Sequence, residues 1–135
     1  MTAARFGTGL IGAIALGGAA GTALRAAIAQ ALPTRMGAFP WATLVVNVSG
    51  SLIIGLVIAL AVERAAPQRY LRPLVGTGFC GGLTTFSTFA VETDSLLRAG
   101  RIGVAAGYAL LSVAAGLVAV WVGSRVVRLT VRREV

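Results

Sequence analysis

Residues 80–89 read CGGLTTFSTF, and this stretch decides how the chain folds. Two adjacent glycines interrupt an apolar run, and two pairs of hydroxyl residues then follow, each ending in a phenylalanine and none carrying a charge. Gly81 and Gly82 favour a break in a helix, and a break frees backbone N–H and C=O groups that lipid cannot satisfy. Freed carbonyls attract a cation, whereas freed amides at a new helix start attract an anion. The stretch therefore predicts a broken helix whose freed backbone groups bond to protein, to water or to an ion.

The composition places this helix in a membrane. Of the 135 residues, 57% are hydrophobic and 12% are charged, and the mean hydropathy is +0.89. That apolar content exceeds what a soluble domain of this size buries. Four stretches are long enough to cross a bilayer, which takes about 20 residues. We expect an all-α membrane protein with one domain, residues 1–135, whose four transmembrane helices span about 6–32, 39–62, 73–97 and 102–126, the third being broken near Gly81-Gly82.

The basic residues are all arginines, and they flank the apolar runs. There are twelve of them against four acidic residues, which gives a net charge of +8. Because the arginines form no stripe with aromatic residues, they indicate anchors at the membrane interface and not a nucleic-acid surface. The lack of histidine and the single cysteine, Cys80, exclude an intrachain disulfide, a Cys/His zinc cluster and a serine–histidine triad.

Four spans place both termini on one side of the membrane, so the arginines can be counted by side. One side carries Arg5, Arg64, Arg69, Arg72, Arg125, Arg128, Arg132 and Arg133, and the other carries Arg25, Arg35, Arg98 and Arg101. Eight against four favours a cytoplasmic N-terminus. The bias rests on the C-terminal tail, because without Arg128, Arg132 and Arg133 the count is five against four. A chain with so even a remaining count can insert in either orientation.

Uncharged polar side chains lie inside the second and third spans. Asn47 must face protein or water, since an unbonded amide is costly in lipid. It forms either a structural hydrogen bond between helices or a contact with an ion. In the third span, Thr85 and Thr88 share a helical face that continues to Glu92.

Aromatic side chains accompany these polar groups. Phe86 and Phe89 lie on the face next to the hydroxyls, and the positive edges of their rings can hold an anion without a formal charge. In the fourth span, Tyr108 and Ser112 lie four residues apart on one face. The alternative is a set of core rings and capping hydroxyls, but four hydroxyls exceed what one helix break needs.

The charge pattern separates a passive pore from other membrane functions. No acidic residue lies at the centre of a span, whereas a proton-coupled transporter usually needs an ionisable group there. A selective anion pore needs weak, multiple contacts that let the ion leave again. A small multidrug antiporter would need a carboxylate in the first span, which has none. A non-transporting accessory subunit explains the glycines but not the hydroxyl–phenylalanine cluster, and no catalytic constellation indicates an enzyme.

Three segments carry a resemblance to a known family. They are GGAAGTALR at 17–25, TLVVNVSGSLIIG at 43–55 and GTGFCGGLTTFSTFAVE at 76–92. The chain resembles the small fluoride channels of the Fluc (CrcB) family over essentially its whole length. It departs from the family pattern at Ala26, where an aromatic residue is expected, and at Thr22, where alanine is common.

The resemblance implies a passive, highly selective fluoride channel that removes fluoride from the cytoplasm across the plasma (inner) membrane. It implies an antiparallel, dual-topology homodimer with two pores, each built from both subunits. It also implies a structural sodium ion where the broken third helices cross, held by backbone carbonyls of Gly81 and Thr84.

The resemblance also assigns residues to the ion pathway. It implies that Phe86 and Phe89 line the pore, and that Asn47 contacts the ion or orients those rings. Arg25 would lie near the aqueous vestibule. The polar track along the pore would comprise Thr85, Thr88, Tyr108, Ser112 and Glu92.

Overall fold

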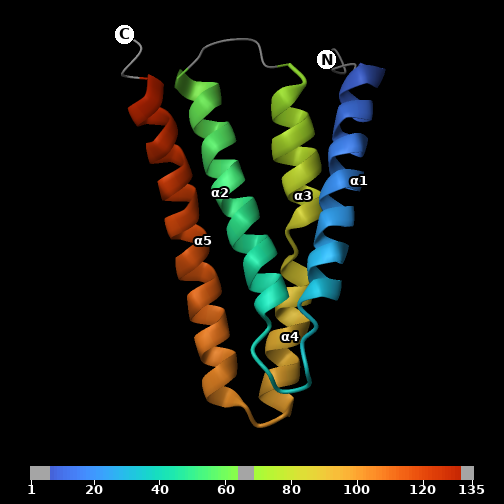
Figure 1. Ribbon diagram of the computed structural model, residues 1–135, viewed down its shortest axis with the longest axis vertical. Helices are drawn as coiled ribbons and strands as arrows, with labels where there is room; N and C mark the ends of the chain where they lie inside the picture. Colours follow the sequence, from blue (N-terminus) through green and yellow to red (C-terminus); the bar gives the residue numbers. More distant parts are fainter. Residues whose placement is uncertain (1–6, 64–68, 132–135) are drawn as a thin grey trace, which may run out of the picture.

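The computed structural model describes residues 7–63 and 69–131, and every regular element in these ranges is a helix (Figure 1). The elements are α1 (Thr8–Ala31), α2 (Trp41–Glu63), η1 (Arg72–Phe79), α3 (Cys80–Leu83), α4 (Phe86–Arg98) and α5 (Ile102–Val131). η1 has the wider turns of a π-helix and continues directly into α3. Together with α4, these two elements form the third span.

Four stretches are long and apolar enough to cross a membrane, as the sequence predicts. They are Thr8–Ala31, Trp41–Glu63, Arg72–Arg98 and Ile102–Val131. Many of their large apolar side chains are exposed on the single chain, Leu16, Leu110 and Leu117 among them. So much exposed apolar surface marks contact with lipid or with another protein. The chain is a multi-pass integral membrane protein.

Consecutive spans run antiparallel, so that α1 begins and α5 ends at the same end of the molecule (Figure 1). This arrangement agrees with the predicted placement of both termini on one side. Four of the arginines used in the count of orientation, Arg5, Arg64, Arg132 and Arg133, lie outside the described residues.

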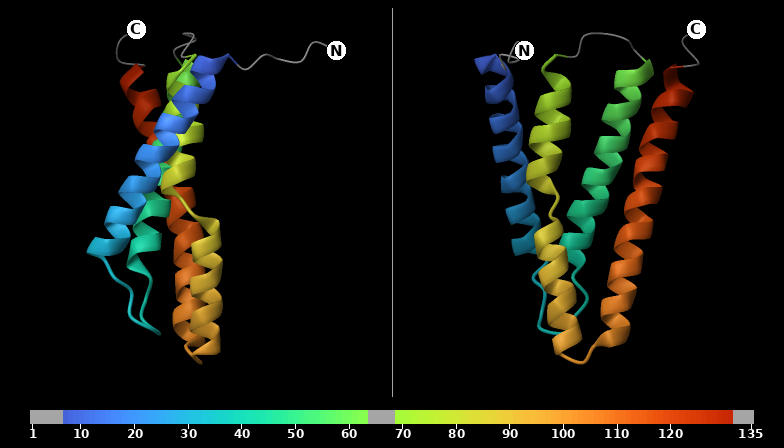
Figure 2. Two further views of the ribbon diagram at one scale, coloured as in Figure 1. Left: turned by 90° about the vertical axis from the view of Figure 1, so that its right-hand side faces the viewer. Right: turned by 180° about the vertical axis from the view of Figure 1, so that it is seen from behind.

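The spans pack as two pairs, α2 with α5 and α1 with η1 and α3 (Figures 1 and 2). Gly17 and Gly21 of α1 approach the backbone carbonyls of Leu74 and Phe79 so closely that a Cβ would overlap the oxygen atoms. Gly55 of α2 makes a similar approach to the backbone of α5. Small residues permit such contacts in lipid, where van der Waals packing holds helices together. These glycines therefore serve packing within one chain.

The third span is broken near Gly81-Gly82, as predicted, but the two glycines themselves do not form the break. Gly81 and Gly82 are helical within α3, and the backbone becomes extended only at Thr84 (φ −81°, ψ 157°) and Thr85 (φ −150°, ψ 120°). Gly82 lies against α1 instead, where a Cβ would overlap the carbonyl oxygen of Gly18. A glycine that permits close packing and a glycine that breaks a helix look the same in a sequence, so the two roles were confused.

The third span changes its packing partner at the break. Before it, η1 and α3 pack on α1, whereas after it α4 packs on α5. Figure 2 shows that α4 follows α5 while the lower part of α1 diverges from both. This divergence opens the side of the bundle next to the break, and the polar residues gather there.

Candidate functional site

Asn47 of α2 supports the break in the third span. Its Nδ2 donates to the carbonyl oxygen of Thr85 at 3.0 Å, and its Oδ1 accepts from the N–H of Thr85 at 2.8 Å. In a continuous helix that N–H would bond to the carbonyl of Gly81, four residues earlier. The Asn47 amide thus satisfies both backbone groups of an extended residue that lipid could not solvate. The structural hydrogen bond is present, and contact of Asn47 with an ion stays a prediction.

The hydroxyl residues at the break bond to the backbone and to one another. Thr84 Oγ1 donates to the carbonyl of Cys80 at 2.9 Å, and Thr85 Oγ1 caps α4 by accepting from the N–H of Thr88 at 3.1 Å. Thr85 Oγ1 also donates to Thr88 Oγ1 at 3.0 Å and lies 3.2 Å from Ser87 Oγ. Capping therefore accounts for Thr84 and Thr85. The hydroxyls of Ser87 and Thr88 are additional, and they form a polar cluster at the start of α4.

Glu92 joins three helices below this cluster. Thr43 Oγ1 of α2 donates to Glu92 Oε1 at 2.9 Å, and Tyr108 Oη of α5 donates to Glu92 Oε2 at 2.7 Å. Both carboxylate oxygens are thus bonded by neutral hydroxyls from neighbouring helices. Tyr108 is fully buried. Glu92 and Tyr108 come from different spans, and the sequence analysis assigned both to the polar track. The structure brings them into direct contact.

Aromatic rings flank the polar groups. The ring centroids of Phe86 and Phe89 lie 5.8 Å apart, and those of Phe89 and Tyr108 lie 5.2 Å apart. Phe39, which precedes α2, meets the Tyr108 ring edge-on at 5.4 Å. Phe86 differs from the others because it is 80% exposed at the first position of α4. Phe89 therefore belongs to a packed ring cluster, whereas Phe86 faces outward from the chain.

Ser112 lies one turn after Tyr108 on α5. Its Oγ is buried and has no hydrogen-bond partner within residues 7–63 and 69–131. Serine hydroxyls in helices commonly bond the carbonyl four residues before, as Ser124 does to Val120 at 2.9 Å on the same helix. A buried polar group left without a bond costs about 1–3 kcal/mol. Ser112 is thus able to bind a ligand that the chain alone does not supply.

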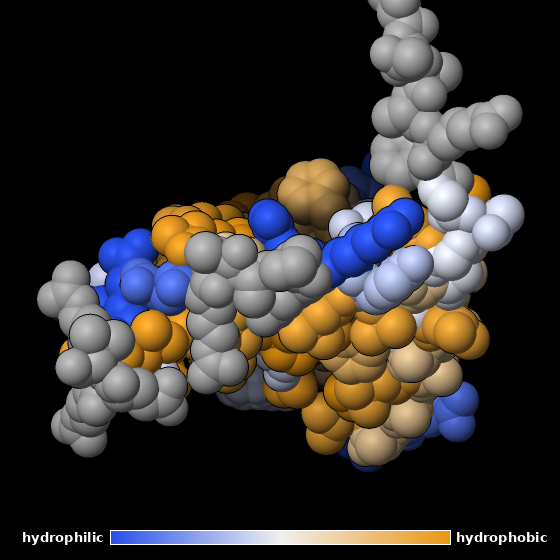
Figure 3. Space-filling model, turned by 90° about the horizontal axis from the view of Figure 1, so that it is seen from above, coloured by the Kyte–Doolittle hydropathy of each residue, from blue (hydrophilic) through white to orange (hydrophobic). Residues whose placement is uncertain are grey.

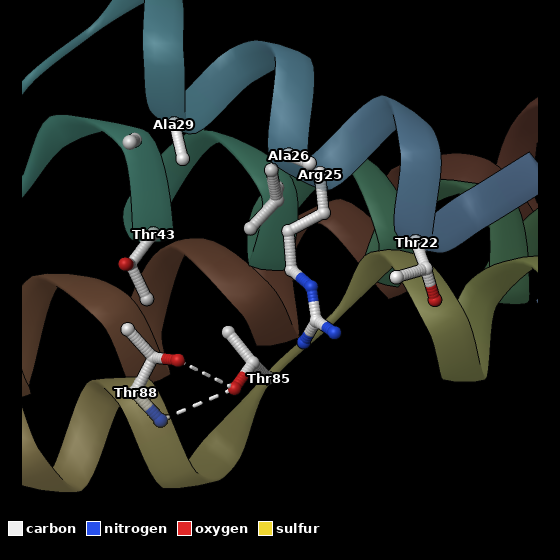
Figure 4. A pocket seen from close by; sticks show the side chains of 9 residues that line it. Thr22, Arg25, Ala26, Ala29, Thr43, Thr85 and Thr88 are labelled. Atoms are coloured by element: carbon white, nitrogen blue, oxygen red, sulfur yellow. Dashed lines mark hydrogen bonds between the residues drawn. The ribbon is translucent and has the colours of Figure 1, made fainter.

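A cleft of about 290 Å³ opens between α1, α2 and α4 beside the break (Figure 4). Its walls are Thr22, Arg25, Ala26 and Ala29 of α1, Ala42, Thr43 and Val46 of α2, and Thr85 and Thr88 of α4. The Arg25 side chain points from α1 toward the break, where Nη1 donates to the carbonyl of Thr84 at 3.4 Å. The cleft thus combines a cation with hydroxyl groups, which is an environment suited to an anion.

The carbonyls released at the break fit a cation only in part. Gly81 is exposed. Its carbonyl lacks the helical hydrogen bond from the N–H of Thr85, because that N–H donates to Asn47 Oδ1 instead. The Thr84 carbonyl accepts from the guanidinium of Arg25, which would repel a second cation placed beside it. No group of three or more His, Cys, Asp or Glu that could hold a metal occurs in the described ranges. A sodium site here needs carbonyl ligands, and Gly81 fits that role better than Thr84.

Sequence reasoning missed two members of this site. Thr43 lies one helical turn before Asn47, so the shared face was visible, but its partner Glu92 is 49 residues away in the chain. Phe39 precedes Pro40 at the start of α2, where an aromatic residue is typical of a membrane interface. Only the packing of α2 against the third and fourth spans brings both residues to the site.

Known proteins share this sequence over most of its length. Residues 12–124 match the family described as CrcB-like protein, Camphor Resistance (CrcB). The chain belongs to the CrcB family. The resemblance seen in the three sequence segments is therefore confirmed.

Relatives in this family carry names that state a function. The chain is 45% identical over 118 residues to fluoride-specific ion channel FluC 1 of Mycolicibacterium paratuberculosis, which covers 87% of this chain and 89% of the relative. It is 44% identical over 116 residues to fluoride-specific ion channel FluC of Solibacter usitatus, with 85% and 95% covered. It is 41% identical over 124 residues to the FluC of Methylobacillus flagellatus, with 88% and 94% covered. These relatives are named as ion channels and not as enzymes.

Proposed function

We propose that this CrcB protein is a passive, highly selective fluoride channel that exports fluoride from the cytoplasm across the plasma (inner) membrane. The observation that carries the proposal is the line of hydroxyl groups and aromatic rings from the break to Tyr108, in a chain whose relatives are named fluoride-specific ion channels. The line runs along the bundle beside a cleft whose walls include Arg25. It offers an anion several weak contacts in place of one strong site, which is what conduction requires.

The pathway we propose begins at the cleft and follows the polar line. Arg25 attracts the anion to the vestibule, and the hydroxyls of Thr85 and Thr88 replace part of its hydration shell. The ring edges of Phe86 and Phe89 then hold it without a full charge.

Further along, the track continues on α5. Tyr108 and Glu92 lie next to Phe89, and Ser112 has a buried hydroxyl to offer. Asn47 orients this end of α4 through the backbone of Thr85. Its contribution in this proposal is to position the rings and hydroxyls.

One chain does not enclose a pore around these residues. Phe86 is exposed, and so are Ser87 and Thr88 beside it at the start of α4. We propose that a second, antiparallel copy covers this face, so that each of two pores takes residues from both subunits. The nearly even arginine count outside the C-terminal tail supports insertion in both orientations.

We further propose a sodium ion on the symmetry axis of that dimer, where the two breaks meet. The exposed position of Gly81 supports this, because its carbonyl lacks the N–H of Thr85 and two such carbonyls at one axis need a cation. The Thr84 carbonyl joins the site only if Arg25 releases it. Thermal unfolding of the dimer in sodium chloride and in choline chloride tests the site, since bound sodium raises the unfolding temperature. Equal unfolding temperatures in both salts would remove sodium from the proposal.

The direction of transport follows from the chemistry of fluoride. In acid surroundings fluoride enters a cell as neutral HF and ionises in the cytoplasm. A negative-inside potential drives the anion outward with about 2.3 kcal/mol per 100 mV. A passive pore is therefore sufficient for export.

Efflux from liposomes tests the proposed function. Purified protein is reconstituted into vesicles loaded with potassium fluoride or potassium chloride, valinomycin is added, and release is followed with ion-selective electrodes. We expect rapid fluoride loss and no chloride loss. Equal loss of both ions would reject the selectivity. If vesicles with folded protein release neither fluoride nor chloride, the result would favour a non-transporting accessory subunit.

A further inference from the structure

The C-terminal part of α5 carries a groove of about 470 Å³ that is separate from the ion pathway. It is lined by Leu117, Val120, Trp121, Ser124, Arg125 and Arg128. These residues recur at intervals of three and four, so they form one stripe along the helix. The stripe is apolar at Leu117 and Val120 and cationic at its outer end. Figure 3 views the molecule from that end and shows hydrophilic side chains over the end of α5 beside hydrophobic surface.

The two arginines are held in place by different neighbours. The guanidinium carbon of Arg125 lies 5.3 Å from the centroid of the Trp121 ring, a cation–π contact that keeps the side chain along the helix. Arg128 Nε lies 3.8 Å from Glu63 Oε1 at the end of α2, and the Arg128 side chain stays 57% exposed. Glu63 therefore pairs with Arg128 only, and among the described residues that line the groove the two arginines supply the only charges.

The length of the groove matches one leaflet of a bilayer. Arg128 lies eleven positions after Leu117, which corresponds to about 16 Å along a helix. The hydrocarbon core of a bilayer is about 30 Å thick, so one leaflet is about half of that. Trp121 lies four positions after Leu117, about 6 Å along the helix, so its ring lies beside the acyl chains of that leaflet.

We propose that this groove binds an anionic phospholipid. The phosphate lies between Arg125 and Arg128, and an acyl chain follows Leu117 and Val120 toward the membrane centre. Charge complementarity selects the headgroup, because a zwitterionic lipid brings a cation of its own to the two guanidinium groups. The opposite end of α5 lacks this combination, since exposed Gly103 and Gly107 follow Arg101 there. The proposal does not depend on which ion the protein conducts.

Tryptophan fluorescence provides a direct test, because the chain has only two tryptophans. Trp41→Phe leaves Trp121 as the reporter in the groove. Trp121→Phe leaves Trp41, at the start of α2 and the other end of the molecule, as the matched control. Each variant is reconstituted into vesicles of phosphatidylglycerol and phosphatidylcholine in equal parts. One lipid at a time carries brominated acyl chains, which quench tryptophan on contact.

We expect phosphatidylglycerol to compete for contact with Trp121 at least about fivefold better than phosphatidylcholine, the advantage of about one arginine near a surface. The double change Arg125→Gln with Arg128→Gln should remove this preference. The matched change Arg98→Gln with Arg101→Gln, at the other end, should leave it intact. Raising potassium chloride to about 1 M, where the Debye length is about 3 Å, should weaken the preference without any mutation at the arginines.

Three results would overturn the proposal. Equal quenching of Trp121 by both lipids would make the groove an ordinary lipid-facing surface. Absence of quenching by either lipid would mean that a second copy of the chain covers it. An equal preference at Trp41 would indicate general enrichment of the anionic lipid around the protein. The salt series decides the question even if the double glutamine variant fails to fold.

Discussion

The two halves of the third span differ in partner, chemistry and exposure. Before the break, η1 and α3 lie with their backbone against Gly17 and Gly21 of α1, and no side chain fits between them. After the break, α4 begins with the exposed Phe86 and a cluster of hydroxyls, and it packs on α5. The first half fixes the span in the bundle through backbone packing. Because of this anchor, the second half can present rings and hydroxyls to an ion or a partner.

This comparison predicts that changes in the first half affect folding and changes in the second half affect conduction. A Cβ added where two backbones touch meets backbone atoms, which cannot move aside as a flexible side chain can. The two helices must therefore separate. An exposed residue such as Phe86 contributes little to stability in the single chain. The variants below test this division, from the largest expected effect to the smallest.

Gly21→Ala should have the largest effect. The new Cβ would overlap the carbonyl oxygen of Phe79 and approach the N–H of Leu83, so α1 and α3 must move apart. We expect destabilisation of about 3 kcal/mol or more, seen as aggregated protein in size-exclusion chromatography and a lower unfolding temperature. Gly12→Ala is the matched control on α1, because its Cβ meets nothing within 4 Å. Equal behaviour of the two variants would contradict the anchoring role of the first half.

Asn47 bonds the backbone of Thr85, which separates the two halves of the third span. Asn47→Asp should abolish conduction. Aspartate cannot donate to the Thr85 carbonyl, and it adds a negative charge beside the anion path. We expect fluoride efflux to fall by at least about 100-fold, equivalent to about 2.7 kcal/mol, with a lower unfolding temperature as well. Normal efflux from this variant would show that Asn47 has only a structural role.

The sequence predicted the four spans well because their length and apolar content do not depend on tertiary contacts. It located the break two to three residues too early, because the extended backbone at Thr84 and Thr85 depends on a hydrogen-bond partner in α2. Asn47 was recognised as buried and polar, but its bonds to a residue 38 positions away were not predictable. The same holds for the contact between Tyr108 and Glu92, which requires the third span to change its packing partner from α1 to α5 at the break.

Phe86→Ile should separate conduction from folding in the second half. Phe86 is 80% exposed on the single chain, so its replacement should change chain stability by less than about 0.5 kcal/mol. Isoleucine has no positive ring edge, and we expect fluoride efflux to fall by at least about tenfold, as for about 1.4 kcal/mol of lost interaction. Phe89→Ile should also suppress efflux, with some loss of stability because that ring packs on Tyr108.

Phe79→Ile is the control for the phenylalanine variants, since Phe79 lies in the first half and lines an apolar cleft with Leu16 and Leu74. Its efflux should stay near that of the unmodified protein. Undiminished efflux in both Phe86→Ile and Phe89→Ile would remove the rings from the mechanism. A loss of efflux in Phe79→Ile as large as theirs would contradict the division between the halves.

Thr84→Ala should have the smallest effect, because the groups that matter at this residue belong to the backbone. The change removes one hydrogen bond to Cys80 and the methyl contact with Gly50, and it keeps the carbonyl that faces Arg25. We expect destabilisation of about 0.5–1.5 kcal/mol and efflux within about threefold of the unmodified protein. Thr77→Ala, at an exposed position of η1, is the control for loss of a threonine in this span. Complete loss of assembly in Thr84→Ala alone would mean that its side chain, and not only its carbonyl, holds the break in place.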